Sequence, residues 1–428
     1  MKPNLLFNTI LSILLFLMAS CSANHEAQLT ITNPSQIERP DELIVVKRSV
    51  IEGKVGKIPS GKYAGLTTAD NRPVVLQYDD LDKDGNWDEA AFLYSFKPKE
   101  ETNFSIAVAN EPAAIKAVVR AHARHRRKNA DNSFGDDLKK DSIPPGQPAT
   151  DFAKQPLPPF LTEGPAWEND KVGFRLYFDV RNGKDIWGKT TSRMVLDEAG
   201  LDTINNYHKQ ADWGMDILKV GKSLGAGSLA LLVPMSNGVD TLVRLGGFNM
   251  GKVIYEKIAD GPVRAILRLH YPEWKILDSL SPVSVTEEIS IWGGQYFYES
   301  KVTVKGAPSN SKLVTGIVNL HSKRSYELDT ADCKILYTYD TQTENNDKLG
   351  MGTIMKKEFF NAFGRTPDMG ADIQNTYTVV ATIEKEEPVV FRFYAGWEKS
   401  SDQLISETGF REYLDKQAVF IRYPVIIK

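Results

Sequence analysis

One segment of the chain, residues 163–228, gathers the side chains best suited to chemistry on a polar ligand. Within it, Arg175, Tyr177, Asp179 and Arg181 alternate with apolar residues, and a period of two predicts a strand with one core face and one polar face. The core face comprises Val172, Phe174, Leu176, Phe178 and Val180. The polar face would offer cations and hydroxyl groups to a polyhydroxylated, anionic ligand. Strand faces are also often charged simply because they meet solvent, so the pattern leaves both interpretations open.

Two tryptophans flank the predicted strand and favour a ligand cleft. Trp167 and Trp187 could each stack a flat apolar ring on a sugar face, and exposed aromatic rings are disfavoured without a partner. The same segment contains further candidate ligand-binding residues, namely Glu168, Asn169, Lys189, Lys219 and Lys222. The glycines around the last two lysines fit no nucleotide-binding spacing, so no phosphate loop is predicted.

The composition is that of an ordinary globular protein with room for a large core. The chain has 428 residues, of which 42% are hydrophobic and 25% are charged. Its net charge of −3 provides no global basic field, so nucleic acid is not an expected partner. An anionic ligand would have to be bound by local positive charge.

The N-terminus is typical of an export signal. An apolar run at 5–17 follows Lys2 and is too short for a membrane span. Small residues then precede Cys21, which predicts a signal peptide over 1–20, lipid attachment at Cys21 and a tether over 21–42; the alternative is a plain signal peptide cut nearby. The protein would then be held at the cell envelope, on the outer membrane or facing the periplasm. Only Cys333 remains, so neither an internal disulfide nor a cysteine-based metal site is expected.

An acidic loop near the N-terminus carries the spacing of a calcium-binding loop. Asp80, Asp82, Asp84 and Asp88 surround Gly85, and carboxylates at alternate positions of a tight loop can converge on one hard cation. Ala91 replaces the bidentate Glu at the twelfth position, so the loop should join two strands and not the two helices of an EF-hand. A structural Ca²⁺ site is one interpretation, and an acidic turn is the other. No organic cofactor is expected.

The rest of the chain predicts an all-β fold with a few short helices. Strands are expected at 229–235, 241–245, 263–270, 283–292, 296–304, 313–321, 333–339, 377–383 and 389–394, and helices at 201–209 and 406–417. Such spacing favours large stacked antiparallel sheets, and one sandwich domain over 43–428. Residues 129–160 form a Pro-rich loop. Residues 115–128, with His122, read as a basic edge strand or as a positive wall for an anionic substrate.

Several long motifs resemble those of a known family. GPAWENDKVGFRLYF, DIWGK and DWGMDILKVGKSLGAG, with DLDKDGNWDEAAF before them and FYAGWEK after them, resemble an exported bacterial family long filed as a domain of unknown function and encoded among polysaccharide-degrading enzymes. The resemblance covers most of the mature chain. It implies a β-supersandwich of the galactose-mutarotase group and an ulvan-oligosaccharide dehydratase, acting on a sulfated, uronate-containing algal glycan. The long Pro-rich loop departs from the pattern.

A uronate substrate would allow β-elimination, because its carboxylate acidifies the neighbouring ring C–H. Arg181 or Arg175 could grip the carboxylate, His208 could remove the proton, and Tyr177 could donate to the leaving oxygen. Lys219 and Lys222 could bind sulfate or carboxylate. His122, His270 and His321 are reserve bases. His208 also fits a simply exposed position in a polar segment.

Three other functions, two catalytic and one non-catalytic, remain compatible with the same residues. If a sugar leaves in place of water, the enzyme is a lyase. A glycoside hydrolase would need two carboxylic acids across the site, for which Glu163, Glu168, Asp179 and Asp212 are available. A non-catalytic glycan-binding lipoprotein would explain the export signal and the Arg-aromatic pattern equally well.

Overall fold

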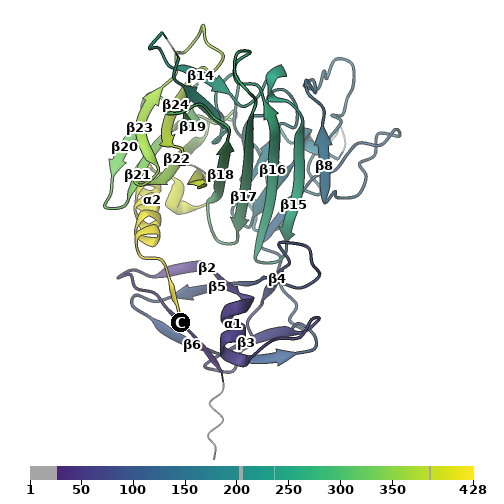
Figure 1. The fold of residues 1–428 in the computed structure, drawn as a ribbon, viewed down its shortest axis with the longest axis vertical. Helices are drawn as coiled ribbons and strands as arrows, with labels where there is room; N and C mark the ends of the chain where they lie inside the picture. The colour runs from purple at the N-terminus through teal and green to yellow at the C-terminus, as the bar shows by residue number, and fades with distance from the viewer. Residues whose placement is uncertain (1–26, 202–205, 236, 385–386) are drawn as a thin grey trace, which may run out of the picture.

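The regular secondary structure of the protein is mostly β-strand, arranged in two bodies with a long C-terminal helix between them (Figure 1). The computed structural model describes residues 27–201, 206–235, 237–384 and 387–428. The expected all-β architecture with few short helices is confirmed. Cys21 and the predicted signal peptide lie outside the described residues. Among those described, no helix has the length and apolar character needed to cross a membrane.

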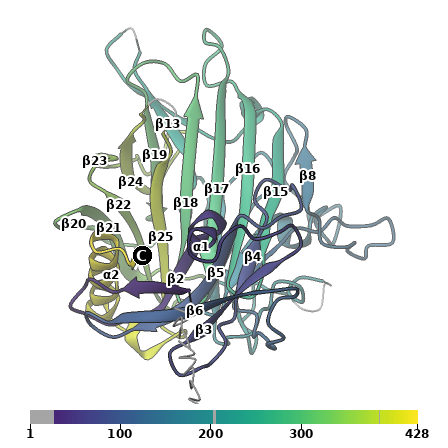
Figure 2. The ribbon, with the colours of Figure 1, turned by 60° about the horizontal axis from the view of Figure 1, so that its bottom comes forward.

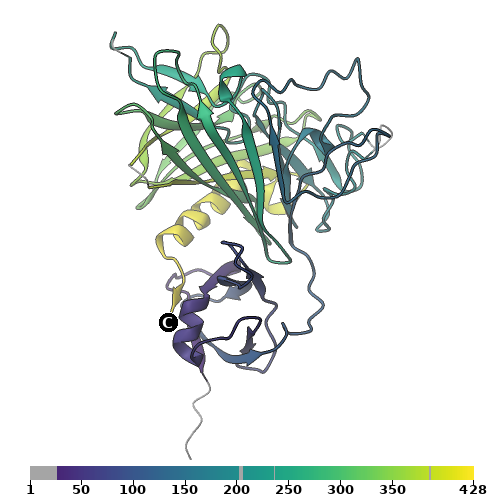
Figure 3. The same cartoon turned by 45° about the vertical axis from the view of Figure 1, so that its right-hand side comes forward.

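The N-terminal residues form the smaller body, which has a hydrophobic core of its own (Figures 1 and 3). One sheet has the order β26-β1-β6-β3, with β26 (Ile426–Ile427), β1 (Gln28–Thr32), β6 (Glu101–Ala109) and β3 (Tyr63–Thr68). The other has the order β2-β5-β4, with β2 (Arg39–Lys47), β5 (Glu89–Phe96) and β4 (Gln77–Asp79). Helix α1 (Arg48–Val55) follows β2 and buries Ile51.

The predicted tether is wrong from residue 28 onwards. Leu29 and Ile31 of β1 are fully buried, because β1 pairs on one side with β6 and on the other with the C-terminal strand β26. The first and the last strand of the described chain are therefore neighbours in one sheet of the smaller body, which Figure 2 shows turned toward the viewer. A single domain from residue 43 was expected, whereas the core of the smaller body is separate from that of the larger one.

The larger body is a sandwich whose main sheet has nine strands. Their order is β20 (Tyr326–Asp329), β21 (Cys333–Thr341), β22 (Lys348–Lys356), β25 (Val389–Trp397), β18 (Phe297–Lys305), β17 (Val283–Trp292), β16 (Arg264–Trp274), β15 (Val253–Asp260) and β8 (Lys140–Ile143). All its pairings are antiparallel. Strand β17 is typical of this sheet. Along its predicted span, buried residues that face the core alternate with half-buried polar residues.

Two five-stranded sheets pack against the nine-stranded sheet. The first runs β12 (Gly214–Asp216), β11 (Lys184–Lys189), β10 (Val172–Leu176), β9 (Ala166–Asn169) and β7 (Ala121–Arg124). The second runs β14 (Thr241–Arg244), β13 (Ala230–Val233), β19 (Lys312–Val318), β24 (Thr376–Thr382) and β23 (Phe360–Arg365). One apolar cluster joins all three sheets, and Phe174 of β10 meets Tyr298 of β18 edge-on with ring centroids 4.8 Å apart.

Helix α2 (Glu407–Arg422) confirms the helix expected at 406–417 and extends it. Ser406 caps its N-terminus by accepting a hydrogen bond from the Gly409 amide, and Phe410, Leu414 and Ala418 form one buried stripe at helical spacing. The stripe packs on β21 and β22, so α2 covers that end of the main sheet before the chain returns to the smaller body (Figure 1).

Other local predictions need correction. The central strand was expected to continue to Val180, but β10 ends at Leu176, and both of its faces are buried because sheet neighbours and charged groups cover the side expected to face solvent. The Pro-rich segment 129–160 contains β8, which pairs with β15. Of the segment 115–128 only β7 is a strand, at the edge of its sheet. Residues 206–209 form a turn, and the rest of the expected helix at 201–209 lies largely outside the described residues.

Candidate functional site

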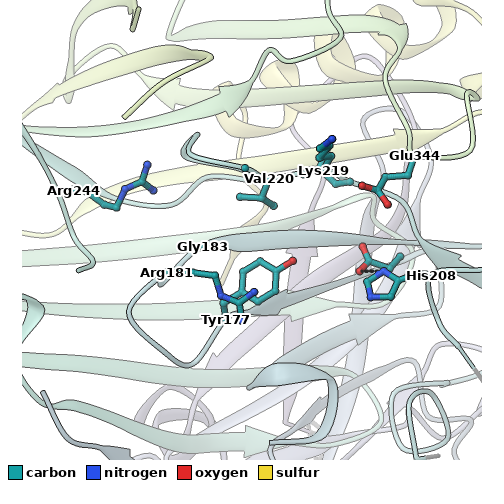
Figure 4. Close-up of a pocket in the computed structure, with 11 residues that line it drawn as sticks. Tyr177, Arg181, Gly183, His208, Lys219, Val220, Arg244 and Glu344 are labelled. Atoms are coloured by element: carbon teal, nitrogen blue, oxygen red, sulfur yellow. Dashed lines mark ion pairs between the residues drawn. The ribbon is translucent and has the colours of Figure 1, made fainter. Parts of the chain in front are cut away.

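A pocket of about 270 Å³ opens where the first five-stranded sheet meets the edge of the second (Figure 4). It is lined by Tyr177, Arg181, Gly183, His208, Asp216, Leu218, Lys219, Val220, Gly221, Arg244 and Glu344. The turn between β10 and β11 supplies Tyr177 and Arg181, and the residues before and after β12 supply His208 and Lys219. The structure thus brings together four residues that the sequence singled out.

Arg181 orients the ring of Tyr177. Its guanidinium carbon lies 3.9 Å from the ring centroid, and its Nη2 donates to Glu163 Oε1 and to Asp179 Oδ2, each at 2.6 Å. These two carboxylates hold the guanidinium over the ring and neutralise its charge. In Figure 4 the hydroxyl group of Tyr177 points away from Arg181, toward the side on which His208 lies.

Arg175 lies beneath the pocket, fully buried, and joins the polar groups of its floor. Its Nη2 donates to the Tyr177 hydroxyl at 2.9 Å, to Asp185 Oδ2 at 2.8 Å and to Asp216 Oδ2 at 2.5 Å. The Tyr177 hydroxyl in turn donates to Asp185 Oδ2 at 2.8 Å. Sequence analysis assigned Arg175 to ligand binding; the structure instead gives its guanidinium to buried carboxylates, because β10 is covered on both faces.

Burial sets the proton affinity of the floor. It raises the pKa of the Asp185 carboxyl to about 7, reinforced by the nearby Asp216 and opposed by Arg175 and Tyr177. It also raises the pKa of Tyr177 well above its ordinary value, with Arg175 opposing the shift. Tyr177 is therefore a neutral phenol near neutral pH and can act as a proton donor.

His208 is held by one ring nitrogen at the mouth of the pocket. Its Nδ1 lies 3.2 Å from Asp216 Oδ2, and this hydrogen bond raises the pKa of the imidazole, against the effect of burial. Nε2 remains as the nitrogen that can exchange a proton with a ligand. The backbone helps to fix the pair, since the Asp216 amide donates to the Tyr207 carbonyl at 2.8 Å.

Two strained backbone positions support this floor. Thr162 and Glu163 both have positive φ, 50° and 67°, which non-glycine residues rarely adopt, and Glu163 is one of the two partners that hold Arg181. At Gly214 (φ +127°) a Cβ would lie 1.8 Å from the Gly188 carbonyl oxygen, so only glycine allows β12 to approach β11. That approach places Asp216 next to Arg175.

The pocket contains one cation without a carboxylate partner among the described residues. Lys219 is exposed and has no ion pair there, whereas Arg244 donates to the Ser223 carbonyl at 2.8 Å and to the Lys222 carbonyl at 2.5 Å. Glu344 lies near Lys219 on the opposite wall from Tyr177 (Figure 4). Lys219 is therefore the side chain best placed to attract an anionic group.

Five predicted ligand-binding residues are not in the pocket. Trp167 and Trp187 are fully buried, so neither can stack on a sugar: Trp167 packs on Tyr298, and Trp187 packs between Tyr207 and Trp213. Lys189 and Glu168 form a buried ion pair, and the Asn169 amide donates to the Trp292 and Gln295 carbonyls at 2.6 and 2.7 Å. All five sit in the body of the sheet, where packing and internal hydrogen bonds occupy them.

The remaining basic candidates also lie outside the pocket lining. Lys222 is exposed beside it, with its carbonyl bound by Arg244. The imidazole of His122 is shared between Asp197 at 3.2 Å and Asp260 at 3.1 Å. His270 contacts Thr286, and His321 is exposed. None of these three histidines lines the pocket of Tyr177.

Sequence reasoning missed the two aspartates of the floor. Asp185 opens the DIWGK motif and Asp216 lies in DWGMD, so both were within the motifs that carried the family resemblance. Their chemistry was hidden because neither shows the period of a polar strand face: Asp185 precedes an apolar run, and Asp216 follows two small or apolar residues. Arg244 and Glu344 come from distant segments and carried no signal.

The acidic loop joins β4 to β5, as predicted for a strand-to-strand connection. Carboxylate oxygens of Asp80, Asp82 and Asp88 lie within 4.8 Å of one another, and Asp84 is not part of this group. The oxygens also accept backbone hydrogen bonds within the loop, for example Asp80 Oδ2 from the Gly85 amide at 2.9 Å. The residues present could hold a hard cation, and they equally form an acidic turn.

Comparison with known proteins places this architecture in a family. The family model described as "Domain of unknown function (DUF4861)" matches residues 31–427. An uncharacterized protein, P7, of Formosa agariphila is 20% identical over 429 residues, covering 96% of this chain and 95% of its own. Among solved structures, an alpha-mannosidase from Enterococcus faecalis V583 has a TM-score of 0.50 at 10% identity, with 94% of this chain covered. The chain spans about half of that enzyme, 45%, so the likeness concerns the fold.

Proposed function

We propose that this chain, which belongs to the DUF4861 family, is a carbohydrate-active lyase that removes water from a uronate-containing, anionic oligosaccharide by β-elimination. The observation that carries the proposal is the pocket itself. A histidine held by a buried carboxylate, a half-buried neutral tyrosine and a lysine without an ion pair among the described residues all line one cavity. These are the base, the acid and the cation that elimination next to a carboxylate needs.

Each group has a defined task in the proposed reaction. Lys219 binds the uronate carboxylate and stabilises the negative charge that develops on it when the neighbouring C–H is broken. His208 removes that proton through Nε2, while Asp216 holds Nδ1 and stabilises the imidazolium that forms. Tyr177 donates its phenolic proton to the departing hydroxyl, which leaves as water. The electron pair of the C–H bond becomes the new C=C bond.

Arg181 takes a different role from the one its sequence position suggested. Both carboxylates that hold it are almost fully buried, so a substrate carboxylate would have to compete with two existing ion pairs. We therefore assign it to orienting Tyr177, and we assign carboxylate binding to Lys219, which has no ion pair among the described residues. The fold likeness to an alpha-mannosidase is compatible with a sugar ligand. An ulvan-type substrate and a lipid-anchored site in the cell envelope belong to the same proposal.

A glycoside hydrolase is the second candidate, because Asp216 and Glu344 both line the pocket. Hydrolysis needs one carboxylic acid on each side of the scissile bond. Asp185 cannot serve as the partner of Asp216, since both bind the same guanidinium nitrogen beneath the cavity. Glu344 is the remaining acid for that reaction.

The decisive experiment mixes the purified protein with uronate-containing oligosaccharides and follows ultraviolet absorbance and product mass. Elimination creates a conjugated unsaturated uronate that absorbs, and dehydration lowers the mass by one water without shortening the chain. Hydrolysis or binding produces no absorbance. His208→Ala and Tyr177→Phe should each lower turnover by about 10²–10⁴-fold. His321→Ala is the matched control, since His321 is exposed and outside the pocket lining. Chain shortening without absorbance would refute the proposal in favour of hydrolysis.

A further inference from the structure

The buried floor of the pocket links the two residues that exchange protons with the substrate. From the Tyr177 hydroxyl a hydrogen bond leads to Asp185 Oδ2 at 2.8 Å, and Arg175 Nη2 then touches both Asp185 and Asp216. Asp216 Oδ2 in turn lies 3.2 Å from His208 Nδ1. A floor that served only to hold Tyr177 in place would not need a second carboxylate beside the first.

We propose that Asp185 stores a proton beneath the pocket and returns it to Tyr177 after each turnover, while Arg175 keeps the two in contact. This inference rests on the proposed function, because it assumes that Tyr177 loses its proton to the substrate. Asp185 acts through Tyr177 and does not itself reach the ligand, so it is a positioning and proton-returning residue.

The groups around Asp185 act on its proton affinity in opposite directions: Arg175 and Tyr177 favour the carboxylate, whereas burial and Asp216 favour the protonated form. Arg175 from β10 and the hydroxyl of Tyr177 face its Oδ2, and the Ile186 amide donates to its Oδ1 at 2.8 Å. Asp216 approaches the same guanidinium from β12, and Glu163 lies 3.5 Å from Arg175 Nη1 on the far side.

Two further residues lie around the Arg175 guanidinium and Asp216. Arg175 Nη1 donates to the Tyr207 hydroxyl, and His208 lies on the far side of Asp216. One guanidinium therefore meets three buried carboxylates. Burial and the nearby Asp216 raise the pKa of the Asp185 carboxyl to about 7, so a proton can be held on this side of the pocket floor near neutral pH.

The proton balance closes over one cycle. His208 gains the proton of the C–H bond, and Tyr177 loses its phenolic proton to the hydroxyl that leaves as water. The Asp185 proton then passes along the 2.8 Å hydrogen bond to the phenolate, leaving the Asp185 carboxylate. His208, the half-exposed end of the network, releases its proton to solvent, and Asp185 regains a proton from solvent in the emptied pocket through the Tyr177 hydroxyl. The substrate has lost water, and the protein is unchanged.

The first test separates the first turnover from later ones in the full-length protein. With enzyme in excess over a uronate-containing oligosaccharide, Asp185→Asn should form unsaturated product at close to the wild-type rate. In the steady state its turnover should fall by about 10²-fold, because only the slow return of a proton to Tyr177 is affected. The wild-type steady-state rate should also decline as pH rises through about 7, and this limb should be absent in the variant. Asp212→Asn, at an exposed site, is the charge-matched control.

The second test needs no activity. Infrared difference spectra of the wild-type protein should show a protonated carboxyl C=O stretch that disappears as pH rises through about 7 and that is missing from Asp185→Asn. Asp216→Asn removes the neighbouring negative charge, so it should move this titration to lower pH. If Asp185→Asn does not fold, the Asp216→Asn shift still decides the point.

Two results would overturn the inference. One is a wild-type spectrum without a carboxyl that titrates near neutral pH. The other is an equal loss of the first and later turnovers in Asp185→Asn, which would leave Asp185 only a structural role. A wild-type protein that forms no unsaturated product on any uronate would instead contradict the proposed function. The infrared titration of the carboxyl would still show whether Asp185 holds a proton near neutral pH.

Discussion

Replacing Asp185 by Asn should make the stability of the protein less dependent on pH. In the folded state burial raises the pKa of this carboxyl from its ordinary 3.8 to about 7. Between those two values the folded protein therefore binds more protons at this site than the unfolded chain. The sign follows from linkage: the stabilising contribution is complete below about pH 4 and is lost as pH rises through about 7.

The magnitude can be worked from the size of the shift. A change of about three pKa units corresponds to a free energy of unfolding on the order of 4 kcal/mol, at about 1.4 kcal/mol per unit. For a chain of 428 residues, an unfolding entropy of about 2.1 cal/mol/K per residue gives about 0.9 kcal/mol per degree. The wild-type melting temperature should therefore fall by about 5 °C relative to Asp185→Asn between pH 4 and pH 8.

The measurement is a series of thermal melts of both proteins across that range. At each pH the melting temperature of Asp185→Asn is subtracted from that of the wild type. The change of this difference with pH is the result, because replacing the carboxylate by an amide also changes the contact with Arg175 by a roughly constant amount. Asp212→Asn is again the control: its exposed carboxyl should leave the difference flat. A flat difference for Asp185→Asn as well would show that this carboxyl is ionised throughout, and would refute the reasoning about the pocket floor.

Four further predictions follow from the described contacts. Lys219→Ala should raise KM for a uronate oligosaccharide by about 10-fold or more, as loss of a charge-assisted hydrogen bond implies, and an equal effect of Lys222→Ala would contradict it. Arg181→Lys should lower kcat with KM largely kept, since an ammonium cannot reproduce the planar contact with Tyr177 or the fork to two carboxylates; unchanged kcat in steady-state assays would remove this role. Calcium should raise the melting temperature and Asp82→Asn should abolish that rise, whereas no response to calcium or a chelator would leave an acidic turn. Cys21→Ser should release the protein from membranes or block processing, and unchanged fractionation would exclude lipid attachment.

The fold class was predictable because most strands keep a strict period of two. Strand β17 (Val283–Trp292) was predicted at its observed bounds, since one face is buried along its whole length. Strand β15 was missed because a register shift between Lys257 and Ala259 breaks the alternation. Strand β22 was missed because its Gly350 and Gly352 weaken a strand pattern. Gly350 is required by a distant element, because a Cβ there would lie 2.5 Å from the Phe410 ring of α2.

The site was only partly predictable, for a related reason. Tyr177, Arg181 and His208 stood out as polar residues in an otherwise apolar or motif-rich context, and they share one pocket. Trp167 and Trp187 stood out equally, but an aromatic ring fills a core as readily as a cleft, and local sequence does not say which. Burial of the polar side of β10 depends on β9 and β11 and on groups from β12, which only the folded chain brings together.

The charge balance of the pocket floor is the strongest argument that it serves function and not stability. Four carboxylates are buried there, those of Glu163, Asp179, Asp185 and Asp216, against the guanidinium groups of Arg175 and Arg181. Taking charges out of water is expensive, and well-packed apolar residues would often stabilise such a site better. The excess of negative charge also raises the proton affinity of the groups that remain, as it does for His208 and Asp185. A floor of this kind is poorly suited to holding a fold together, which supports the proposal that it keeps a proton available beneath Tyr177.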